Sequence, residues 1–409
     1  MKPSHDTLER IAREHGDSFY LLDLDAFRSN YHRLRDSFRN HYPDTEIAYS
    51  YKTNYTPRLT KLVDSWGGYA EVVSRMEYDL ALRVGVEPAR IVFNGPYKRP
   101  EDVEFALGNG STVHVDAPWQ ADEVAAVARR ASGKVRAGVR VTFDTGTGKP
   151  SRFGCDADND AELVAVFKTL RDAGVHVTGV HCHFSNPSRG VDVYQRVAKR
   201  MIAIADRFFG DEIPDYIDIG GGFFSNMSDE LRAQFDAQIP TYEQYGDGIA
   251  PLFAERYGKE GGPQLILEPG VSITADIMQF AARVLDVRPV GPRRIALVAG
   301  SIHNIKPTLN AKNLPFQLVR GGDGATIEGP YDIVGYTCME HDLLFGGAEG
   351  SVGVGDWAVF DNVGAYTNVM KPPFIRQQVP ILAVEGGEPT GEVVKRAETL
   401  DDVISTYSI

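Results

Sequence analysis

The chain has 409 residues, of which 43% are hydrophobic and 24% are charged, and its formal net charge at pH 7 is −13. This composition is typical of a soluble globular protein that is long enough for two domains. An acidic chain without a block of Lys and Arg argues against nucleic acid or an anionic membrane as a main partner. The three cysteines, the start without an apolar signal core and the lack of any run of about 18 apolar residues predict a cytoplasmic protein without a disulfide framework.

Short apolar segments rich in β-forming residues recur eight times, and most of them are followed by a stretch with helical periodicity. Strand then helix, repeated eight times, is the pattern of an α/β fold, the (β/α)8 or TIM barrel, whose functional groups lie on the loops after the strands. The predicted strands are Ile47 to Tyr51, Tyr69 to Val73, Ile91 to Asn94, Thr112 to Val115, Val135 to Phe143, Val177 to His183, Tyr216 to Ile219 and Leu265 to Leu267. The predicted helices include Met76 to Arg83, Ala121 to Ala131, Ala161 to Ala173 and Tyr194 to Phe209.

The pattern changes after residue 276. Apolar alternation in Ile295 to Val298 and in Val352 to Phe360, separated by Gly, Pro and Asn turns, predicts a β-rich domain. Tyr20 to Leu22, near the start of the chain, can add a strand to this domain. We therefore predict a barrel over residues 25–275, inserted between the two parts of a β-rich domain made of residues 1–24 and 276–409.

Two candidates for chemistry follow predicted barrel strands. Lys52 follows the first, and a lysine at a barrel mouth can be partly desolvated, which lowers its pKa and frees its amine for a Schiff base. A surface lysine at a strand end would give the same pattern. Gly220, Gly221 and Gly222 follow the seventh strand, where backbone N–H groups can approach an anion such as phosphate, and a flexible turn is the alternative.

His181 and His183 end the sixth strand, and their spacing of two places both imidazoles on one face. Such a pair can bind a metal, and a single imidazole can stack on an aromatic cofactor. The sequence offers no obvious carboxylate or thiolate to complete a metal set, so no metal is predicted, and His181 can be a packed interior residue. Glu268 precedes a Pro-Gly turn after the eighth strand and can keep a pyridine nitrogen protonated, or can only stabilise the turn.

The β-rich domain carries two further candidates. Cys338 lies in the segment Gly335 to Asp342, and Tyr366 lies in the segment Gly364 to Thr367. A thiol can donate a proton, and a tyrosine hydroxyl can bind phosphate. A small buried thiol and a packed aromatic ring are the simpler interpretations of these residues.

Over roughly residues 18–380, the kind, order and spacing of these motifs resemble the fold-type III pyridoxal-phosphate decarboxylases. This family contains diaminopimelate, ornithine and arginine decarboxylases and relatives in siderophore and other specialised-metabolite biosynthesis. The resemblance implies pyridoxal 5'-phosphate as the cofactor. It also implies that Lys52 forms the Schiff base, that His183 stacks on the pyridine face and that Glu268 pairs with the pyridine nitrogen. The implied phosphate ligands are Gly220, Gly221, Gly222 and Tyr366.

The same resemblance implies a homodimer with shared active sites. Cys338 would reach the active site of the neighbouring subunit and protonate the quinonoid carbon. Glu77 falls in a segment that lines the cofactor side of the family's barrel, and Arg152 falls at the family's usual Lys/Arg-Phe-Gly position. The candidates for substrate contact are Arg152, Met339, Glu340 and Asp342.

Three positions depart from the best-known members of the family. Val271 stands where an arginine usually follows Glu-Pro-Gly, and Ser272 is a neutral donor beside it. Met339 stands where an acidic residue usually follows the cysteine, and Ser185 and Asn186 replace the Gly-Ser after the histidine. Because a buried charge that lacks its partner is costly, these changes predict a modified or conjugated amino acid as the substrate, in place of diaminopimelate or ornithine.

The predicted reaction removes the α-carboxylate of the substrate as carbon dioxide, which requires that bond to lie perpendicular to the cofactor ring. An amino-acid racemase of the alanine-racemase kind is the main alternative, but such enzymes have an arginine at the pyridine nitrogen, so Glu268 favours decarboxylation. A non-catalytic pyridoxal-phosphate-binding protein would lack the domain that carries Cys338 and Tyr366. A metal-dependent hydrolase built on His181 and His183 is the remaining alternative.

Overall fold

The structure is a computed structural model that describes residues 1–146, 148, 151–184 and 189–408. Ser185 and Asn186, named above for their position after the histidine, lie outside the described residues. The chain forms two compact units, which we call the sheet unit and the barrel unit. The sheet unit contains Met1–Ser29, Ser225–Asp236 and Ile273–Ile409, and the barrel unit contains Asn30–Phe224 and Ala237–Ser272.

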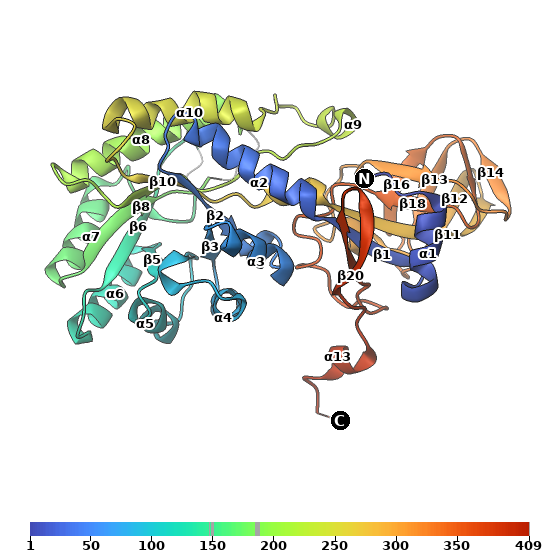
Figure 1. Cartoon of the computed structure of the whole chain (residues 1–409), viewed down its shortest axis with the longest axis horizontal. Helices are drawn as coiled ribbons and strands as arrows, with labels where there is room; N and C mark the ends of the chain where they lie inside the picture. The colour runs from blue at the N-terminus through green and yellow to red at the C-terminus, as the bar shows by residue number, and fades with distance from the viewer. Residues whose placement is uncertain (147, 149–150, 185–188, 409) are drawn as a thin grey trace. The chain divides into compact units, whose positions relative to one another are not determined.

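The barrel unit contains eight parallel strands that close into a barrel, as the sequence predicted (Figure 1). The last strand, β10, pairs with the first, β2, through Leu265 and Thr45, which closes the ring. A ninth short strand, β7 (Cys155–Asp156), pairs with the carboxyl end of β6. The barrel strands are β2 (Thr45–Ser50), β3 (Tyr69–Val72), β4 (Ile91–Phe93), β5 (Thr112–Val115), β6 (Arg136–Thr142), β8 (His176–His181), β9 (Tyr216–Asp218) and β10 (Gln264–Leu267).

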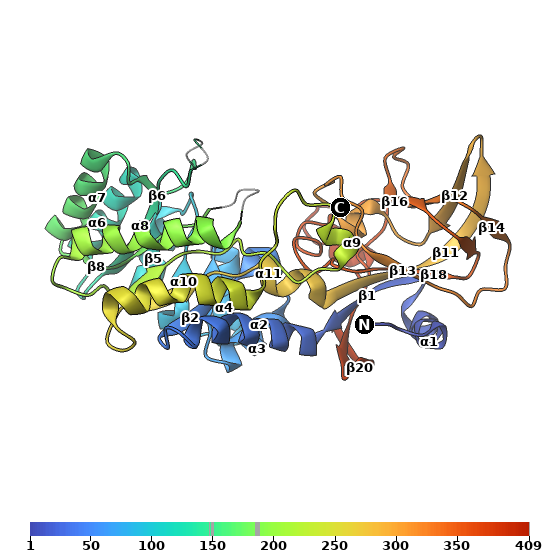
Figure 2. The same ribbon diagram turned by 90° about the horizontal axis from the view of Figure 1, so that it is seen from above.

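Helices follow the strands and cover the barrel, and local sequence signals set their ends. Ser74 accepts a hydrogen bond from the backbone N–H of Glu77 and so begins α4. Three other helices, α3, α5 and α6, begin with proline, which suits the first helical turn. Helices α8 and α10 lie side by side (Figure 2). The helices are α2 (Leu24–Arg39), α3 (Pro57–Ser65), α4 (Arg75–Val84), α5 (Pro100–Gly108), α6 (Pro118–Arg130), α7 (Asp160–Asp172), α8 (Val191–Phe209) and α10 (Tyr242–Tyr257).

The barrel interior is built in layers of four side chains from alternate strands, as is usual for this fold. Residues two apart on one strand point to the same face, so each strand sends alternate residues inward. The first layer contains Ala48, Val92, Gly138 and Tyr216. The second contains Glu71, His114, His181 and Glu268, and the third contains Ser50, Asn94, Arg140 and Asp218, all of them buried. The interior therefore changes from mainly apolar to polar towards the carboxyl ends of the strands.

The sheet unit is built on a nine-stranded, mostly antiparallel sheet. Its strand from the chain start, β1 (Ser18–Asp23), lies between β11 (Met278–Val290) and β19 (Ile381–Glu385). Thus Tyr20 to Leu22 do form a strand of the β-rich unit. The other strands of the sheet are β12 (Arg293–Val298), β13 (Phe316–Val319), β15 (Tyr331–Val334), β16 (Leu343–Ala348), β18 (Trp357–Phe360) and β20 (Glu388–Lys395).

The core of the sheet unit forms where α1 (His5–His15) packs on the sheet through Leu8 and Ile11. Their partners include Phe19 and Trp357, whose ring centroids are 5.4 Å apart.

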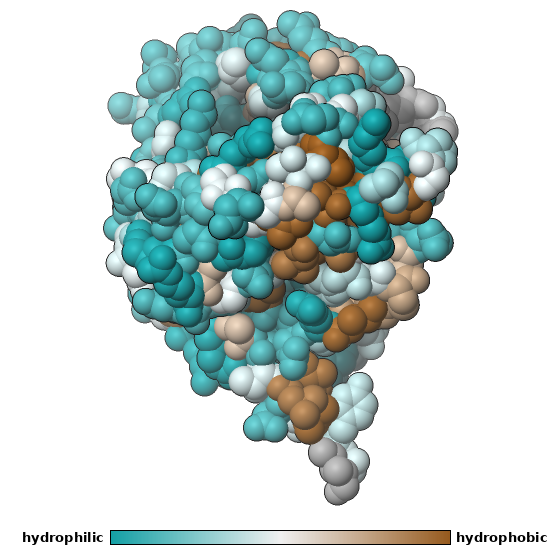
Figure 3. All heavy atoms as spheres, turned by 90° about the vertical axis from the view of Figure 1, so that its right-hand side faces the viewer, coloured by the Kyte–Doolittle hydropathy of each residue, from teal (hydrophilic) through white to brown (hydrophobic). Residues whose placement is uncertain are grey.

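Apolar groups also gather on one outer face (Figure 3). Exposed apolar residues of this unit include Leu309, Met370, Ile375, Leu400 and Tyr407. Within the described residues, none of the helices has the length and apolar character that crossing a membrane requires.

Candidate active site

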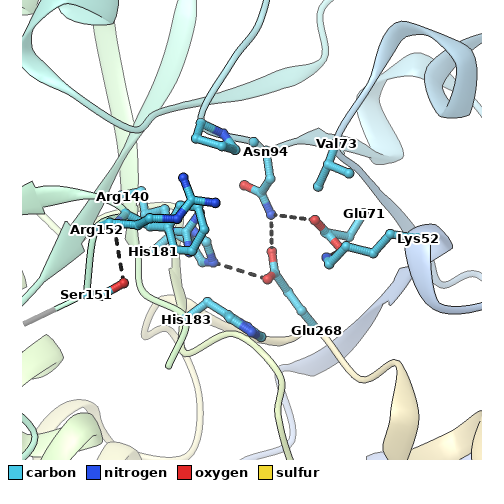
Figure 4. Close-up of a pocket in the computed structure, with 13 residues that line it drawn as sticks. Lys52, Glu71, Val73, Asn94, Arg140, Ser151, Arg152, His181, His183 and Glu268 are labelled. Atoms are coloured by element: carbon cyan, nitrogen blue, oxygen red, sulfur yellow. Dashed lines mark hydrogen bonds and ion pairs between the residues drawn. The ribbon is translucent and has the colours of Figure 1, made fainter. Parts of the chain in front are cut away.

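A cavity of about 370 Å³ opens at the carboxyl ends of the barrel strands. Its volume is in the range of small-molecule sites. Five residues that the sequence pointed to line this one cavity: Lys52, Arg152, His181, His183 and Glu268 (Figure 4). Its other lining side chains are Glu71, Val73, Asn94, Pro96, Arg140, Ser151 and Phe153. The cavity therefore lies at the end of the barrel where this fold carries its chemistry.

Lys52 lies in a one-turn helix directly after β2, with its side chain 31% exposed. Its ammonium forms an ion pair with Glu71 and donates to Ser50 Oγ at 3.1 Å. Ser50 Oγ also donates to Glu71 Oε2 at 2.5 Å. Glu71 is only 1% exposed, so the ion pair joins a buried carboxylate to an amine that faces the cavity. An amine placed in this way can react with a molecule in the cavity while the carboxylate holds its position.

Glu268 is 2% exposed, and its carboxylate has three polar neighbours. Asn94 Nδ2 donates to Glu268 Oε1 at 2.5 Å, and His181 Nε2 lies 3.1 Å from Oε2 (Figure 4). Asp218 is the third neighbour; burial, and then the charge of Glu268, raise the pKa of Asp218 well above its usual range. Its Oδ2 is buried without a hydrogen-bond partner among the described residues, and a proton held on Asp218 removes a second buried negative charge from beside Glu268.

His183 faces the cavity as a neutral imidazole. Burial lowers its pKa to about 3, and the nearby Lys52 charge acts in the same direction. The backbone N–H of Gly221 donates to His183 Nδ1 at 3.0 Å. The ring proton therefore lies on Nε2, and the ring is held in one orientation.

The three glycines after β9 are required by close packing and are not simply a flexible turn. A Cβ on Gly221 would lie 1.9 Å from the Glu268 carbonyl oxygen, and one on Gly220 would lie 2.3 Å from that of Cys182. The N–H groups of Gly220 and Gly221 donate to Asp218 and His183. In the described part of the chain, Gly222 is the one of the three whose N–H has no acceptor, so it is the one that can bind an anion.

The opposite wall of the cavity is cationic. The guanidinium of Arg152 lies 4.0 Å from the centre of the Phe153 ring, and that of Arg140 lies 5.0 Å from the same ring. Arg140 forms a buried ion pair with Asp116, with Nη1 and Oδ1 2.8 Å apart. Arg152 is the more exposed of the two arginines and is therefore better placed to bind an anionic group of a substrate.

Glu77 is buried behind the lysine and does not line the cavity. Its Oε2 accepts a hydrogen bond from the Val73 N–H at 2.8 Å. Burial raises the pKa of Glu77 to about 7, and the charge of Glu71 acts in the same direction. This carboxyl group therefore titrates near neutral pH beside the partner of Lys52.

The remaining predicted site residues belong to the sheet unit. Cys338 and Glu340 are exposed, and Met339 is half-buried, in the loop between β15 and β16. Asp342 is 3% exposed and accepts hydrogen bonds from Thr337 and from the Ile302 N–H, so it shapes this loop from within. Tyr366 is half-buried and has a φ of 59°, an uncommon backbone conformation for tyrosine that is often found at functional sites.

A cluster of potential metal ligands occurs in the polar barrel layers. One ligand atom from each of His114, His181, Asp218 and Glu268 lies within 4.8 Å of the others. Both ring nitrogens of His114 already have neighbours: Nδ1 lies 2.5 Å from Asn94 Oδ1, and Nε2 lies 2.7 Å from the Tyr216 hydroxyl. The four groups therefore belong to a hydrogen-bonded network in the barrel interior.

Sequence reasoning missed Glu71, His114 and Arg140, and named Asn94 without giving it a role. Each occupies an inward position on or just after a barrel strand. The signal was available, because polar residues at inward positions of predicted barrel strands are costly unless they are paired. What the sequence could not supply was the register that brings four strands together.

A barrel whose mouth carries a lysine with a buried carboxylate partner, a neutral histidine and a second buried carboxylate defines a lysine-dependent barrel enzyme. The family model described as the pyridoxal-binding domain of pyridoxal-dependent decarboxylases matches residues 27–275. The chain belongs to this family.

Curated relatives agree with this assignment, and a solved structure shares the fold. The probable chloroplastic diaminopimelate decarboxylase of Oryza sativa subsp. japonica is 28% identical, over 95% of this chain and 79% of the relative. The diaminopimelate decarboxylase of Methanothermobacter thermautotrophicus is 25% identical, over 98% of this chain and 93% of the relative. The crystal structure of diaminopimelate decarboxylase from M. jannaschii has a TM-score of 0.86 at 21% identity and covers 98% of this chain and 94% of that one.

These findings confirm the predicted barrel with a β-rich domain, the fold-type III decarboxylase family and pyridoxal phosphate as the cofactor. The residues present also fit this cofactor. The cavity offers an amine for its aldehyde, Glu268 for its ring nitrogen and a neutral imidazole for its ring face. The N–H of Gly222, which has no acceptor in the described part of the chain, is available to its phosphate.

Proposed function

We propose that the chain removes the α-carboxylate of an amino acid or amino-acid conjugate, with Lys52 as the residue that binds the cofactor. The observation that carries this proposal is the meeting of Lys52, His183 and Glu268 in one cavity at the barrel mouth. Pyridoxal phosphate, when bound, supplies a ring that accepts the electron pair released from the broken carbon–carbon bond.

The residues of the barrel unit have separate tasks. Lys52 Nζ binds the aldehyde and can hold or release a proton beside Glu71. Glu268, held by Asn94 and His181, accepts a hydrogen bond from the protonated ring nitrogen and so keeps that proton in place. His183 packs its neutral ring against the cofactor and adds no charge to it. In the run Gly220 to Gly222, the N–H of Gly222 is the group we expect to bind the phosphate, because those of Gly220 and Gly221 donate to Asp218 and His183, and the Tyr366 hydroxyl is a second proposed phosphate ligand.

Cys338 is the proposed proton donor to the carbon that loses the carboxylate. Its thiol is exposed on the β15–β16 loop. An exposed thiol is accessible to a second chain, which supports a homodimer in which each chain completes the other's site. Met339, Glu340 and Arg152 are the residues we expect to contact the substrate, and Asp342 holds their loop in shape.

The substrate that we propose is a modified or conjugated amino acid, as in siderophore or other specialised-metabolite pathways. Val271 begins the short helix α11 (Val271–Thr274) and supplies no cation there. Its neighbour Ser272 has a buried hydroxyl without a hydrogen-bond partner among the described residues. A substrate with an additional anionic group would find its cation in Arg152, on the other wall of the cavity.

Carbon dioxide release from a panel of amino acids tests the reaction and the substrate together. The panel contains meso-diaminopimelate, L-ornithine and L-arginine, and the first two acylated on their second amine with a dicarboxylic acid. We expect release from an acylated member and little from the three parent compounds. Efficient turnover of a parent compound would contradict the proposed substrate, and inversion of the amino acid without carbon dioxide would contradict the reaction.

A further inference from the structure

Two glycines leave space for a contact across the barrel interior. His114, Gly138, Gly179 and Tyr216 are direct register partners on the adjacent strands β5, β6, β8 and β9. A Cβ on Gly138 would lie 2.0 Å from the Tyr216 hydroxyl and 2.6 Å from His114 Cδ2, and one on Gly179 would lie 2.8 Å from the Tyr216 ring. Because both are glycine, His114 Nε2 and the Tyr216 hydroxyl meet at 2.7 Å. The two glycines between the two large side chains therefore make this contact possible.

This contact continues towards the cavity through Asn94. Its Oδ1 lies 2.5 Å from His114 Nδ1, and its Nδ2 donates to Glu71 Oε1 at 3.0 Å and to Glu268 Oε1 at 2.5 Å. One amide therefore bridges the carboxylate that pairs with Lys52 and the carboxylate proposed to hold the ring nitrogen. Asn94 is 3% exposed, so water cannot replace these hydrogen bonds.

The carboxylate end of this chain of residues sets the direction of its hydrogen bonds. Ionised carboxylates only accept, so Asn94 must present Nδ2 to them and Oδ1 to His114. Burial lowers the pKa of His114 well below its usual range, so the ring is neutral and carries one proton, on Nδ1. Nε2 then accepts from Tyr216, whose own pKa is raised by burial, so that its hydroxyl stays protonated.

We propose that Tyr216, His114 and Asn94 are positioning residues that fix one amide so that it donates to Glu71 and Glu268 together and keeps both carboxylates ionised. The proposal rests on the proposed function, which gives these two carboxylates their tasks. Without this donor, one of the two carboxylates would take up a proton at a higher pH, because a hydrogen bond to the charged form is what favours that form.

Other charged or titratable groups face this pair of carboxylates and are left unchanged in the variants below. Lys98, on the loop after β4, has a pKa lowered by burial to about 7 and lies within electrostatic range of His114 and His181. The groups nearest to the pair are Lys52, Glu77, Arg140, His181, His183 and Asp218. A difference in pH profile between the variants therefore reports the Asn94 amide and the two residues that hold it, His114 and Tyr216.

Tyr216→Phe is the sharpest variant, because it removes only the hydroxyl that supports the His114 tautomer by donating to Nε2. Tyr78→Phe is its matched control: Tyr78 is equally buried, and its hydroxyl bonds to Ser111 at 2.6 Å, away from the cavity. We expect the acidic limb of the kcat/KM profile to move up by about one pH unit in Tyr216→Phe and to stay in place in Tyr78→Phe. Asn94→Leu, which removes both donors, should move the limb further.

A purely structural role would give a different result. Tyr216→Phe would then lose stability as Tyr78→Phe does, while its pH profile would coincide with that of the wild type, and the proposal would be overturned. Because Asn94→Leu leaves two buried carboxylates without their donor, it is the variant most at risk of misfolding. The comparison of Tyr216→Phe with Tyr78→Phe therefore decides the proposal.

A second measurement does not depend on the cofactor. Ring nitrogen shifts of [15N]histidine-labelled protein without pyridoxal phosphate report the tautomer of His114, whose signal is identified by its absence in His114→Gln. We expect the proton on Nδ1 in the wild type and a shift towards Nε2 in Tyr216→Phe. A proton on Nε2 in the wild type would overturn the proposal, whereas a wild type that turns over no amino acid would overturn only the proposed function.

Discussion

The barrel mouth and the Cys338 loop both carry proposed catalytic groups, but they hold them in opposite ways. In the barrel, the groups are buried or half-buried, and each has its position fixed by a neighbour: Lys52 by Glu71, His183 by Gly221 and Glu268 by Asn94. In the sheet unit, the Cys338 thiol is exposed. The barrel site is assembled within one unit, whereas the loop presents a reactive group at a surface.

Changes in the barrel should affect stability and activity together, whereas changes at Cys338 should affect activity alone. Buried polar groups must be paired, so a change in the barrel layers affects the fold as well as the chemistry. An exposed thiol on a loop shaped by Asp342 can change with little effect on the fold. Variants in the two regions should therefore differ in their ratio of lost activity to lost stability.

Glu268→Gln should give the largest loss of activity. A neutral amide cannot keep a proton on the ring nitrogen as a carboxylate does, so we expect kcat to fall on the order of a thousandfold, measured as carbon dioxide release. Glu46→Gln is the control. It makes the same change in a carboxylate that accepts a hydrogen bond from Arg39 near the amino end of β2, away from the cavity. A Glu268→Gln enzyme with kcat within a few-fold of the control would remove this residue from the mechanism.

Cys338→Ala should lower kcat on the order of a hundredfold, as expected for the loss of a general acid. Its thermal unfolding midpoint should stay at the wild-type value, because the side chain is exposed. Unchanged turnover with a clean product would show that another group delivers the proton. Cys182→Ala should show the reverse pattern of lost stability with retained chemistry, because Cys182 is fully buried.

Gly138→Ala should destabilise the barrel by about 2 kcal/mol, because its new Cβ would overlap the Tyr216 hydroxyl and the His114 ring. Gly108→Ala is the matched control: this glycine ends α5, and a Cβ there has no neighbour within 4 Å. Urea unfolding of the two variants gives the comparison. Equal stability of the two would show that the interior row accommodates a methyl group, against the packing described above.

The smallest expected effect is a pH dependence. The pKa of His183 falls from 6.5 to about 3 on folding, so between these values the unfolded chain binds a proton that the folded chain does not. The free energy of unfolding therefore falls as the pH drops below 6.5, by at most about 1.4 kcal/mol per pH unit from this residue. The partly exposed ring lessens this slope.

His183→Gln, which does not titrate there, isolates this contribution. The stability difference between the wild type and His183→Gln should shrink as the pH is lowered from 7 to 5 in urea titrations. His114 and His181 are present in both proteins, so their contributions cancel. A difference that stays constant would mean that His183 is not held neutral in the fold.

The sequence predicted the barrel well, because each strand is a local pattern and the eight strands repeat it. It also pointed to Lys52, His183 and Glu268, which line one cavity in the structure, because each stands at a strand end, next to a recognisable turn or motif. The sequence also singled out the glycine run, but the predicted role of its N–H groups was only part of the reason for the glycines. Its backbone N–H groups were predicted to face phosphate, whereas two of them bond to Asp218 and His183.

The polar network could not be predicted, because it depends on register between strands far apart in the sequence. His114 meets Tyr216 across two intervening strands, and this contact exists only because Gly138 and Gly179 lie between them. Asp342 illustrates the same limit in the sheet unit. Its position near the cysteine suggested contact with substrate, while its hydrogen bonds to Thr337 and Ile302 depend on how the loop folds back.

We propose that Lys52 is the residue that binds pyridoxal phosphate in the barrel cavity. The most direct test is the absorbance spectrum of the purified protein with pyridoxal phosphate, compared with that of Lys52→Ala. We predict the visible band of a lysine Schiff base in the wild type and its loss in the variant. A band that persists in Lys52→Ala, or a wild type that pyridoxal phosphate cannot colour, would contradict the account.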